Sequence, residues 1–195
     1  MKATLLTCVS ALVLGVSTSA VAGADRYTFD KTHTQILFFV DHLGFSRSQG
    51  EFHDYDGGFV FDPDDWSKSS VQVSIRTASI DMDDYAWDKH LRSKDFFNVS
   101  EYPTMTFRGT RLEQTGERTG QLHGELTLLG VTRPVTLQVT FNKAGVHPLN
   151  KMYVAGFSAV AVIRRSDFGM SYALPMVGDE VDLRLEVEGL RQEGS

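Results

Sequence analysis

Apolar and polar residues alternate with a period of two along most of this chain. The clearest run is Val181, Leu183, Leu185 and Val187, whose intervening residues are all charged. Such alternation predicts a β-strand with one dry face and one wet face. Further strand-like runs lie at residues 36–42, 71–75, 104–112, 122–128, 135–141 and 153–163. The pattern therefore predicts an all-β fold.

Turn-forming residues separate these runs at short intervals. They include Asp56-Gly57-Gly58, Asp62-Pro63-Asp64, Thr115-Gly116-Glu117 and residues 130–134, and the hairpin around Gly130 is the clearest of them. This regular spacing predicts an antiparallel sandwich or barrel. Eight strands enclose an interior just wide enough to be filled by side chains or to hold one small ligand. On periodicity alone the 13 Phe residues fill it, and a ligand tunnel is the alternative.

One segment, residues 83–94, departs from the two-residue period. Trp87, His90, Leu91 and Lys94 recur at helical spacing, and Asp83 or Asp84 can cap the first turn. The sequence thus predicts a short helix that forms a lid over one barrel end. We expect Trp87 and Leu91 to pack on the sheet, Phe96 and Phe97 to be tucked beneath, and Asp84, Asp88, Lys89 and Arg92 to face water.

Residues 1–22 have the three-part pattern of a secretory signal peptide. Lys2 precedes an uncharged run over residues 5–16, and Ala20-Val21-Ala22 forms a cleavage pattern, with Ala22-Gly23-Ala24 as a later candidate. The run is shorter than the roughly 20 residues of a membrane span, although a retained anchor is the alternative. We expect an exported, soluble domain over residues 25–191. The only cysteine, Cys8, would be removed, which excludes disulfides and thiolate sites.

The formal net charge of −6, without a basic cluster, argues against binding to nucleic acid or to anionic lipid surfaces. Neither a G-x-S-x-G nucleophile motif nor a Gly-rich phosphate loop occurs. The histidines lack H-x-H, H-x-x-x-H and H-E-x-x-H spacing, so we expect no metal site. His33 follows a turn and is expected to order it. Arg165 and Asp167 are expected to form a turn network rather than a catalytic pair.

Motifs in chain order, from Tyr27 almost to the C-terminus, resemble the YceI family of exported lipid-binding proteins. They are residues 27–34, 38–46, 50–52, 79–81 with 90–97, 102–107, 124–135 and 165–170. The resemblance implies an antiparallel eight-stranded lipocalin-like barrel with an elongated interior pocket, usually in the bacterial periplasm. The implied ligands are polyisoprenoids, isoprenoid quinones or fatty-acid amides. The resemblance also implies that the barrel interior is a ligand tunnel and not a core filled by side chains.

The expected ligand-binding residues combine the apolar faces with these motifs. They are Phe38, Val40, His42, Phe45, Phe52, Ile75, Ile80, Trp87, His90, Leu91, Phe97, Phe107, Phe157, Phe168 and Met170. His42 either contacts a ligand head group or is a core histidine bonded to a backbone carbonyl. His90 either bonds the ligand or belongs to the lid. Trp87 stands where the family often has arginine, which favours a neutral head group over a diphosphate, unless Arg164 compensates.

These features predict a periplasmic protein that carries or stores an isoprenoid, quinone-like or fatty-amide ligand. No cofactor is expected apart from a bound lipid or isoprenoid quinone, and no catalytic residue is assigned. A homodimer is compatible with the pattern, whereas stable membrane insertion is not. One alternative is a hydrolase or isomerase acting on a lipid-like substrate, which requires a carboxylate–histidine pair at the pocket mouth. Another is an interaction module with a filled core.

Overall fold

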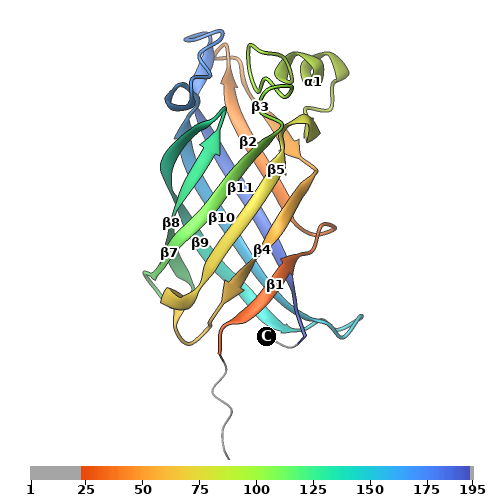
Figure 1. Ribbon diagram of the computed structural model, residues 1–195, viewed down its shortest axis with the longest axis vertical. Helices are drawn as coiled ribbons and strands as arrows, with labels where there is room; N and C mark the ends of the chain where they lie inside the picture. Colours follow the sequence, from red (N-terminus) through yellow and green to blue (C-terminus); the bar gives the residue numbers. More distant parts are fainter. Residues whose placement is uncertain (1–22, 194–195) are drawn as a thin grey trace, which may run out of the picture.

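The strands form one closed antiparallel barrel in the computed structural model, which describes residues 23–193 (Figure 1). The predicted signal peptide, with Cys8, lies outside the described residues. The strands are β1 (Asp25–Phe29), β2 (Gln35–His42), β3 (Ser46–Phe52), β4 (Tyr55–Phe61), β5 (Ser70–Arg76), β6 (Ile80–Asp81), β7 (Thr104–Gln114), β8 (Thr119–Leu128), β9 (Val131–Val146), β10 (Tyr153–Arg164) and β11 (Val177–Arg191). The helical elements are η1 (Trp66–Lys68), η2 (Thr77–Ser79), α1 (Tyr85–Leu91) and η3 (Arg165–Phe168).

The barrel ring has eight strands, as predicted. Its order is β1-β4-β5-β7-β8-β9-β10-β11, and pairing of β1 with β11 closes it. The remaining strands continue the first three barrel strands, because β2 pairs with the 177–186 part of β11 while β1 pairs with its 189–191 part. In the same way β3 continues β4, and β6 continues β5. The chain therefore runs up and down around the barrel in sequence order.

The barrel wall opens on one side at its upper end. β5 pairs with β7 along its length, whereas β6 pairs with β3 alone. The connection from β6 to β7 leaves the wall here and carries α1, which Figure 1 shows at the top of the barrel. Thr77 is fully buried at this branch point. Its amide donates to the Pro103 carbonyl at 3.0 Å and its hydroxyl to the Tyr102 carbonyl at 2.7 Å.

α1 begins where the sequence predicts and ends earlier. The Asp84 carboxylate accepts from the Trp87 amide at 2.9 Å and caps the helix, but the helix stops at Leu91. The expectation that Asp88 and Arg92 face water is wrong. Asp88 accepts from the Met82 amide (2.8 Å) and from Arg92 (3.2 Å), which also donates to the Ile80 carbonyl (2.6 Å). So short a helix is unstable alone, and these bonds attach it to β6.

Two of the predicted turns show how glycine serves different purposes. The hairpin at Gly130 is confirmed, with φ of 51° at Leu129 and 72° at Gly130, as a tight two-residue turn requires. The prediction of a turn at Asp56-Gly57-Gly58 is wrong, because these residues lie inside β4. A Cβ on Gly58 would come within 2.1 Å of the Tyr27 carbonyl oxygen. Glycine there permits close approach of two backbones.

An aromatic cluster closes the lower end of the barrel. The Phe61 ring lies 5.8 Å from Trp66, 5.2 Å from Phe141 and 4.9 Å from Phe157 between centroids. Such edge and tilted contacts add to the burial energy of the rings. Within residues 23–193, no helix has the length and apolar character needed to cross a membrane.

Candidate functional site

An internal cavity of about 430 Å³ extends from this aromatic cluster to the mouth beside α1. The volume lies in the usual range for small-molecule sites. The expectation of a filled core, drawn from periodicity alone, is therefore wrong. Inward-facing side chains of the barrel strands form the wall, and no Asp, Glu or Lys of the described chain is among them. The cavity can accept an apolar molecule and offers no acidic group to it.

The lid helix bridges two sides of the mouth through aromatic contacts. The Trp87 ring lies 5.6 Å from His42 at the end of β2, between centroids. The His90 ring lies 5.1 Å from Phe96 and 5.5 Å from Tyr172 in the β10–β11 connection. Among residues 23–193, neither imidazole has a protein hydrogen-bond partner, which leaves polar nitrogens of both at the mouth.

Arg165 is a buried charge in the cavity wall at the mouth. All its hydrogen-bond acceptors are backbone carbonyls of residues 170–178. Asp179, rather than the predicted Asp167, supplies the carboxylate of the turn network, and it accepts from the Ser166 amide (2.9 Å) and hydroxyl (2.8 Å). Burial lowers the pKa of Arg165, and the nearby Asp179 charge opposes this shift. The guanidinium nevertheless stays charged.

Exposed apolar side chains surround the same mouth. Leu43 and Phe45 come from the β2–β3 turn, Tyr85 from α1, and Tyr172 and Met176 from the β10–β11 connection. The Leu43 amide donates to the Met176 carbonyl at 3.0 Å and holds two of these segments together. Apolar side chains gathered around a cavity entrance favour contact with apolar molecules.

A model of the YceI-like domain matches residues 27–189. The chain belongs to the YceI-like family. A UPF0312 protein of Azotobacter vinelandii is 40% identical over 190 residues, covering 94% of this chain and 97% of its own length. A UPF0312 protein of Pseudomonas aeruginosa is 42% identical over 187 residues, covering 94% and 97%.

Three solved structures share the barrel. The Campylobacter jejuni YceI protein has 31% identity and a TM-score of 0.71, covering 78% of this chain and 90% of its own. Burkholderia cenocepacia BcnA has 24% identity and a TM-score of 0.75, covering 82% and 98%. A polyisoprenoid binding domain from Saccharophagus degradans has 14% identity and a TM-score of 0.66, covering 86% and 99%. The last two likenesses show the fold alone.

This YceI-like barrel places most of the predicted ligand-binding residues on the cavity wall. Those on the wall are Phe38, Val40, His42, Phe52, Ile75, Trp87, His90, Leu91, Phe97, Phe107, Phe157 and Met170. Phe45 is not on it, because it lies in the turn after β2, where strand alternation ends, and is 86% exposed. Ile80 and Phe168 are buried in the core without reaching the cavity.

Sequence reasoning missed two groups of wall residues. The inward positions of β7, β8 and β9, such as Met105, Leu126 and Leu137, belong to strands whose alternation was evident and could have been included. Tyr172 and Ala173 lie in an irregular connection with no periodic signal. Only the closure of the barrel brings that connection beside α1.

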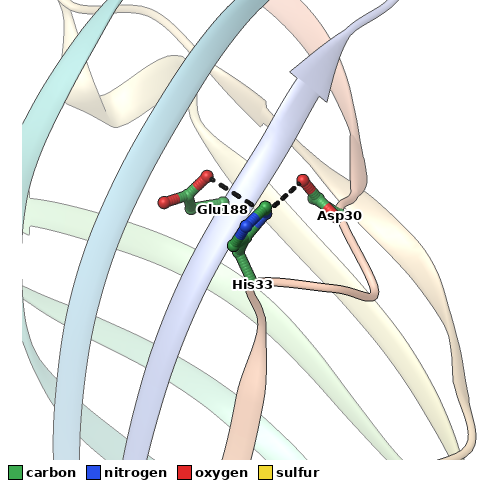
Figure 2. Close-up of side chains that lie close together, drawn as sticks. All are labelled: Asp30, His33 and Glu188. Carbon is green, nitrogen blue, oxygen red and sulfur yellow. Dashed lines mark hydrogen bonds and ion pairs between the residues drawn. The ribbon is translucent and has the colours of Figure 1, made fainter. Parts of the chain in front are cut away.

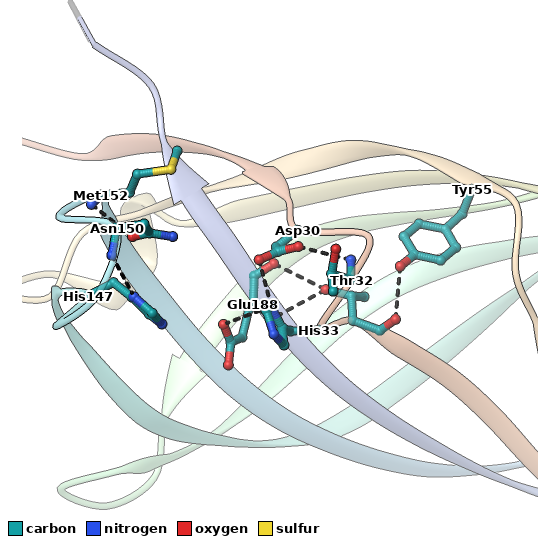
Figure 3. Close-up of polar contacts among 9 residues, drawn as sticks. Asp30, Thr32, His33, Tyr55, His147, Asn150, Met152 and Glu188 are labelled. Carbon is teal, nitrogen blue, oxygen red and sulfur yellow. Dashed lines mark hydrogen bonds and ion pairs between the residues drawn. The ribbon is translucent and has the colours of Figure 1, made fainter.

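His33 orders the turn between β1 and β2, as predicted, and lies on the outer surface (Figure 2). Its Nδ1 lies 2.8 Å from Asp30 Oδ2 and 3.9 Å from Glu188 Oε2. The hydrogen bond to Asp30 raises the pKa of His33. Burial alone would raise the pKa of Asp30, but bonds from His33 and Thr32 outweigh it and lower that pKa. The wider polar network includes Tyr55, whose hydroxyl donates to the Thr34 carbonyl (Figure 3).

The perturbed carboxylate–histidine pairs of this chain do not line the cavity. The possible ligand atoms of Asp30, His33 and Glu188 lie within 4.8 Å of one another, and none of these three residues is on the cavity wall. A second pair, His53 Nε2 to Asp81 Oδ2 at 3.0 Å, is also outside the wall. The hydrolase hypothesis therefore lacks the pair it requires among the described wall residues.

Proposed function

We propose that this YceI-like protein binds one long apolar lipid, of the isoprenoid, quinone-like or fatty-amide class, for carriage or storage. The observation that carries the proposal is an apolar internal cavity that extends from an aromatic cluster at one end to the mouth beside α1. Each methylene transferred from water to such a wall contributes about 0.8 kcal/mol, so a long chain needs no ionic anchor. The polyisoprenoid binding domain with the same fold supports the ligand class.

The proposed orientation places the tail toward the Phe61 end and the head group near α1. Trp87, His42 and His90 surround the entrance, and the indole suits a neutral ring or amide. A diphosphate would require several charged donors, and Arg165 is the only Arg or Lys on the described wall. The orientation therefore favours a quinone or carboxamide head group.

Native mass spectrometry of protein purified from its own host tests the ligand. The expected spectrum contains a species heavier than the polypeptide by the mass of one lipid, which mild activation releases. A bare polypeptide that also takes up neither a long-chain quinone nor a fatty amide would refute the proposal.

We also propose that the lipid is bound in the periplasm, since residues 1–22 have the pattern of a signal peptide. Cell fractionation with N-terminal sequencing tests this separately. The expected N-terminus lies at residues 23–25 in the periplasmic fraction, and an uncleaved cytoplasmic chain would contradict it.

A further inference from the structure

One hydrogen-bond donor at the cavity mouth is left over from the network that holds the β10–β11 connection. A guanidinium carries five N–H groups. In Arg165, Nε donates to the Gly178 carbonyl (2.8 Å), Nη1 to those of Met170 (3.1 Å) and Tyr172 (2.9 Å), and Nη2 to that of Val177 (2.9 Å). These bonds use four N–H groups. Within residues 23–193, the second Nη2 N–H has no protein acceptor.

This donor is buried as well as unused. Arg165 is only 3% exposed and forms part of the cavity wall. Among the residues that the structure describes, its charge also has no ion-pair partner, because the Asp179 carboxylate accepts from Ser166 and makes no ion pair with the guanidinium. A buried charged donor without an acceptor is costly. The four bonds to backbone carbonyls hold the β10–β11 connection in place, but the fifth N–H has no such role.

We propose that the second Nη2 N–H of Arg165 donates to a carbonyl oxygen of the lipid head group. The inference rests on the proposed function and names the chemistry of the head group, which is a neutral carbonyl such as a quinone or a carboxamide. A guanidinium binds a carboxylate or phosphate through two parallel N–H···O hydrogen bonds from a pair of its nitrogens. In Arg165 both such pairs already donate to backbone carbonyls. One available N–H suits one oxygen atom.

The position of Arg165 agrees with the orientation argued above. Its acceptor Tyr172 lies 5.5 Å from His90 of α1 between ring centroids, so the guanidinium belongs to the mouth and not to the aromatic end. A second, charged head-group oxygen would find no further Arg or Lys side chain on the described wall. Anionic head groups should therefore bind less tightly than neutral carbonyls.

A ligand series of constant chain length tests the proposal. A fatty carboxamide, the matching fatty acid and the matching hydrocarbon compete with a fluorescent apolar probe for the delipidated wild-type protein. The carboxamide should bind about 10- to 100-fold more tightly than the hydrocarbon, the range for a hydrogen bond to a charged group. The fatty acid should bind less tightly than the carboxamide. Equal affinity for carboxamide and hydrocarbon, or preference for the acid, would overturn the inference.

Variants assign the effect to Arg165. Arg165→Met removes the donor, so the carboxamide-to-hydrocarbon ratio should fall to about one while hydrocarbon binding reports that the cavity persists. Arg164→Met is the matched control at the exposed neighbour and should keep the ratio. His42→Phe and His90→Phe remove the rival donors and should lower the ratio less than Arg165→Met does. A ratio that survives Arg165→Met, or disappears in a histidine variant, would reject Arg165 as the donor.

Infrared spectroscopy provides a measurement that does not depend on folding of the Arg165 variant. The stretch of a ¹³C-labelled carboxamide carbonyl bound to wild-type protein, and to both histidine variants, should lie below its frequency in hydrocarbon solvent. An unshifted band would overturn the inference. Failure of all three ligands to bind would instead refute the proposed function, and this inference with it, whereas equal binding of all three leaves the function standing.

Discussion

Replacement of Ala159 by Phe distinguishes a cavity from a filled core by the sign of its effect on stability. Ala159 lies on β10 between Val139 of β9 and Leu185 of β11, and all three line the cavity. Its small side chain leaves space on the wall. A phenyl ring at this position would extend into the volume of about 430 Å³.

The two alternatives predict opposite changes in the free energy of unfolding. Adding a ring to a well-packed core costs about 1–3 kcal/mol, because neighbours must move. Burying a Phe side chain in empty apolar space instead contributes about 1.5–3 kcal/mol. The lipid-free variant should therefore be as stable as the wild type or more stable. If the ring takes the place of about three methylenes of the ligand, the binding free energy of the lipid should weaken by about 2.4 kcal/mol, which is about a fiftyfold loss of affinity.

Denaturant unfolding of delipidated protein and displacement of a fluorescent lipid measure the two effects. Val160→Phe is the matched control, because Val160 follows on the same strand but lies 49% exposed outside the cavity. It should leave lipid affinity unchanged. An Ala159→Phe variant that loses more than about 1 kcal/mol of stability while keeping full lipid affinity would show that the cavity reasoning is wrong.

Three further changes test the lid, the branch point and the surface network. Asp84→Ala removes the N-cap of α1, which stabilises the helix by about 1 kcal/mol. The variant should release lipid faster and exchange the amides of residues 85–91 faster, whereas the control Asp95→Ala should change neither rate. Unchanged rates in Asp84→Ala would contradict this. Thr77→Val removes the hydroxyl that the fully buried Thr77 donates to the part-buried Tyr102 carbonyl, and it should cost about 1–3 kcal/mol in denaturant unfolding. Ser79→Ala should cost little, because the hydroxyl bond of Ser79 to the Arg76 carbonyl is exposed. The pKa of His33 is raised above 6.5 and the pKa of Asp30 is lowered below 3.8, so the ion pair stabilises the fold at pH values between these two. The stabilisation is lost when the pH rises through the folded pKa of His33, and also when the pH falls through the folded pKa of Asp30. The stability difference between wild type and His33→Gln should therefore shrink from about pH 6 to about pH 9, and a constant difference would refute the pairing.

The barrel could be predicted because its signal is local and repeated. Alternation such as that of Val181 to Val187 fixes which face of a strand is dry, and the Leu129-Gly130 turn joins two strands directly. The sequence does not show that the first three barrel strands are each broken once. The breaks lie at residues 30–34, 53–54 and 77–79. Gly57-Gly58 resembles a turn but lies inside β4, where it permits close backbone approach.

The cavity was harder to predict than its wall. Alternation assigns Phe38 or Phe107 to the inside, but whether inward side chains meet at the centre depends on the radius of the closed ring. The mouth was hardest, because Arg165, Tyr172 and the histidines come from segments that are distant in sequence. Their juxtaposition follows from the pairing of β10 with β11 and from the position of α1, neither of which has a periodic signature.

The way α1 is attached indicates where the proposed ligand would enter. The barrel has hydrogen-bonded strands around its ring, so opening it between strands breaks many bonds at once. α1 has no buried residue of its own. It is held by the ring contacts of Trp87 and His90, by the partly buried Leu91, and by a few polar contacts, namely Asp88 to the Met82 amide and Arg92 to the Ile80 carbonyl. Segments with little burial open at a small fraction of the global unfolding free energy. Lid opening at this end therefore costs less than any route through the wall, and the exposed apolar side chains around the mouth lie where an apolar chain would first meet the protein.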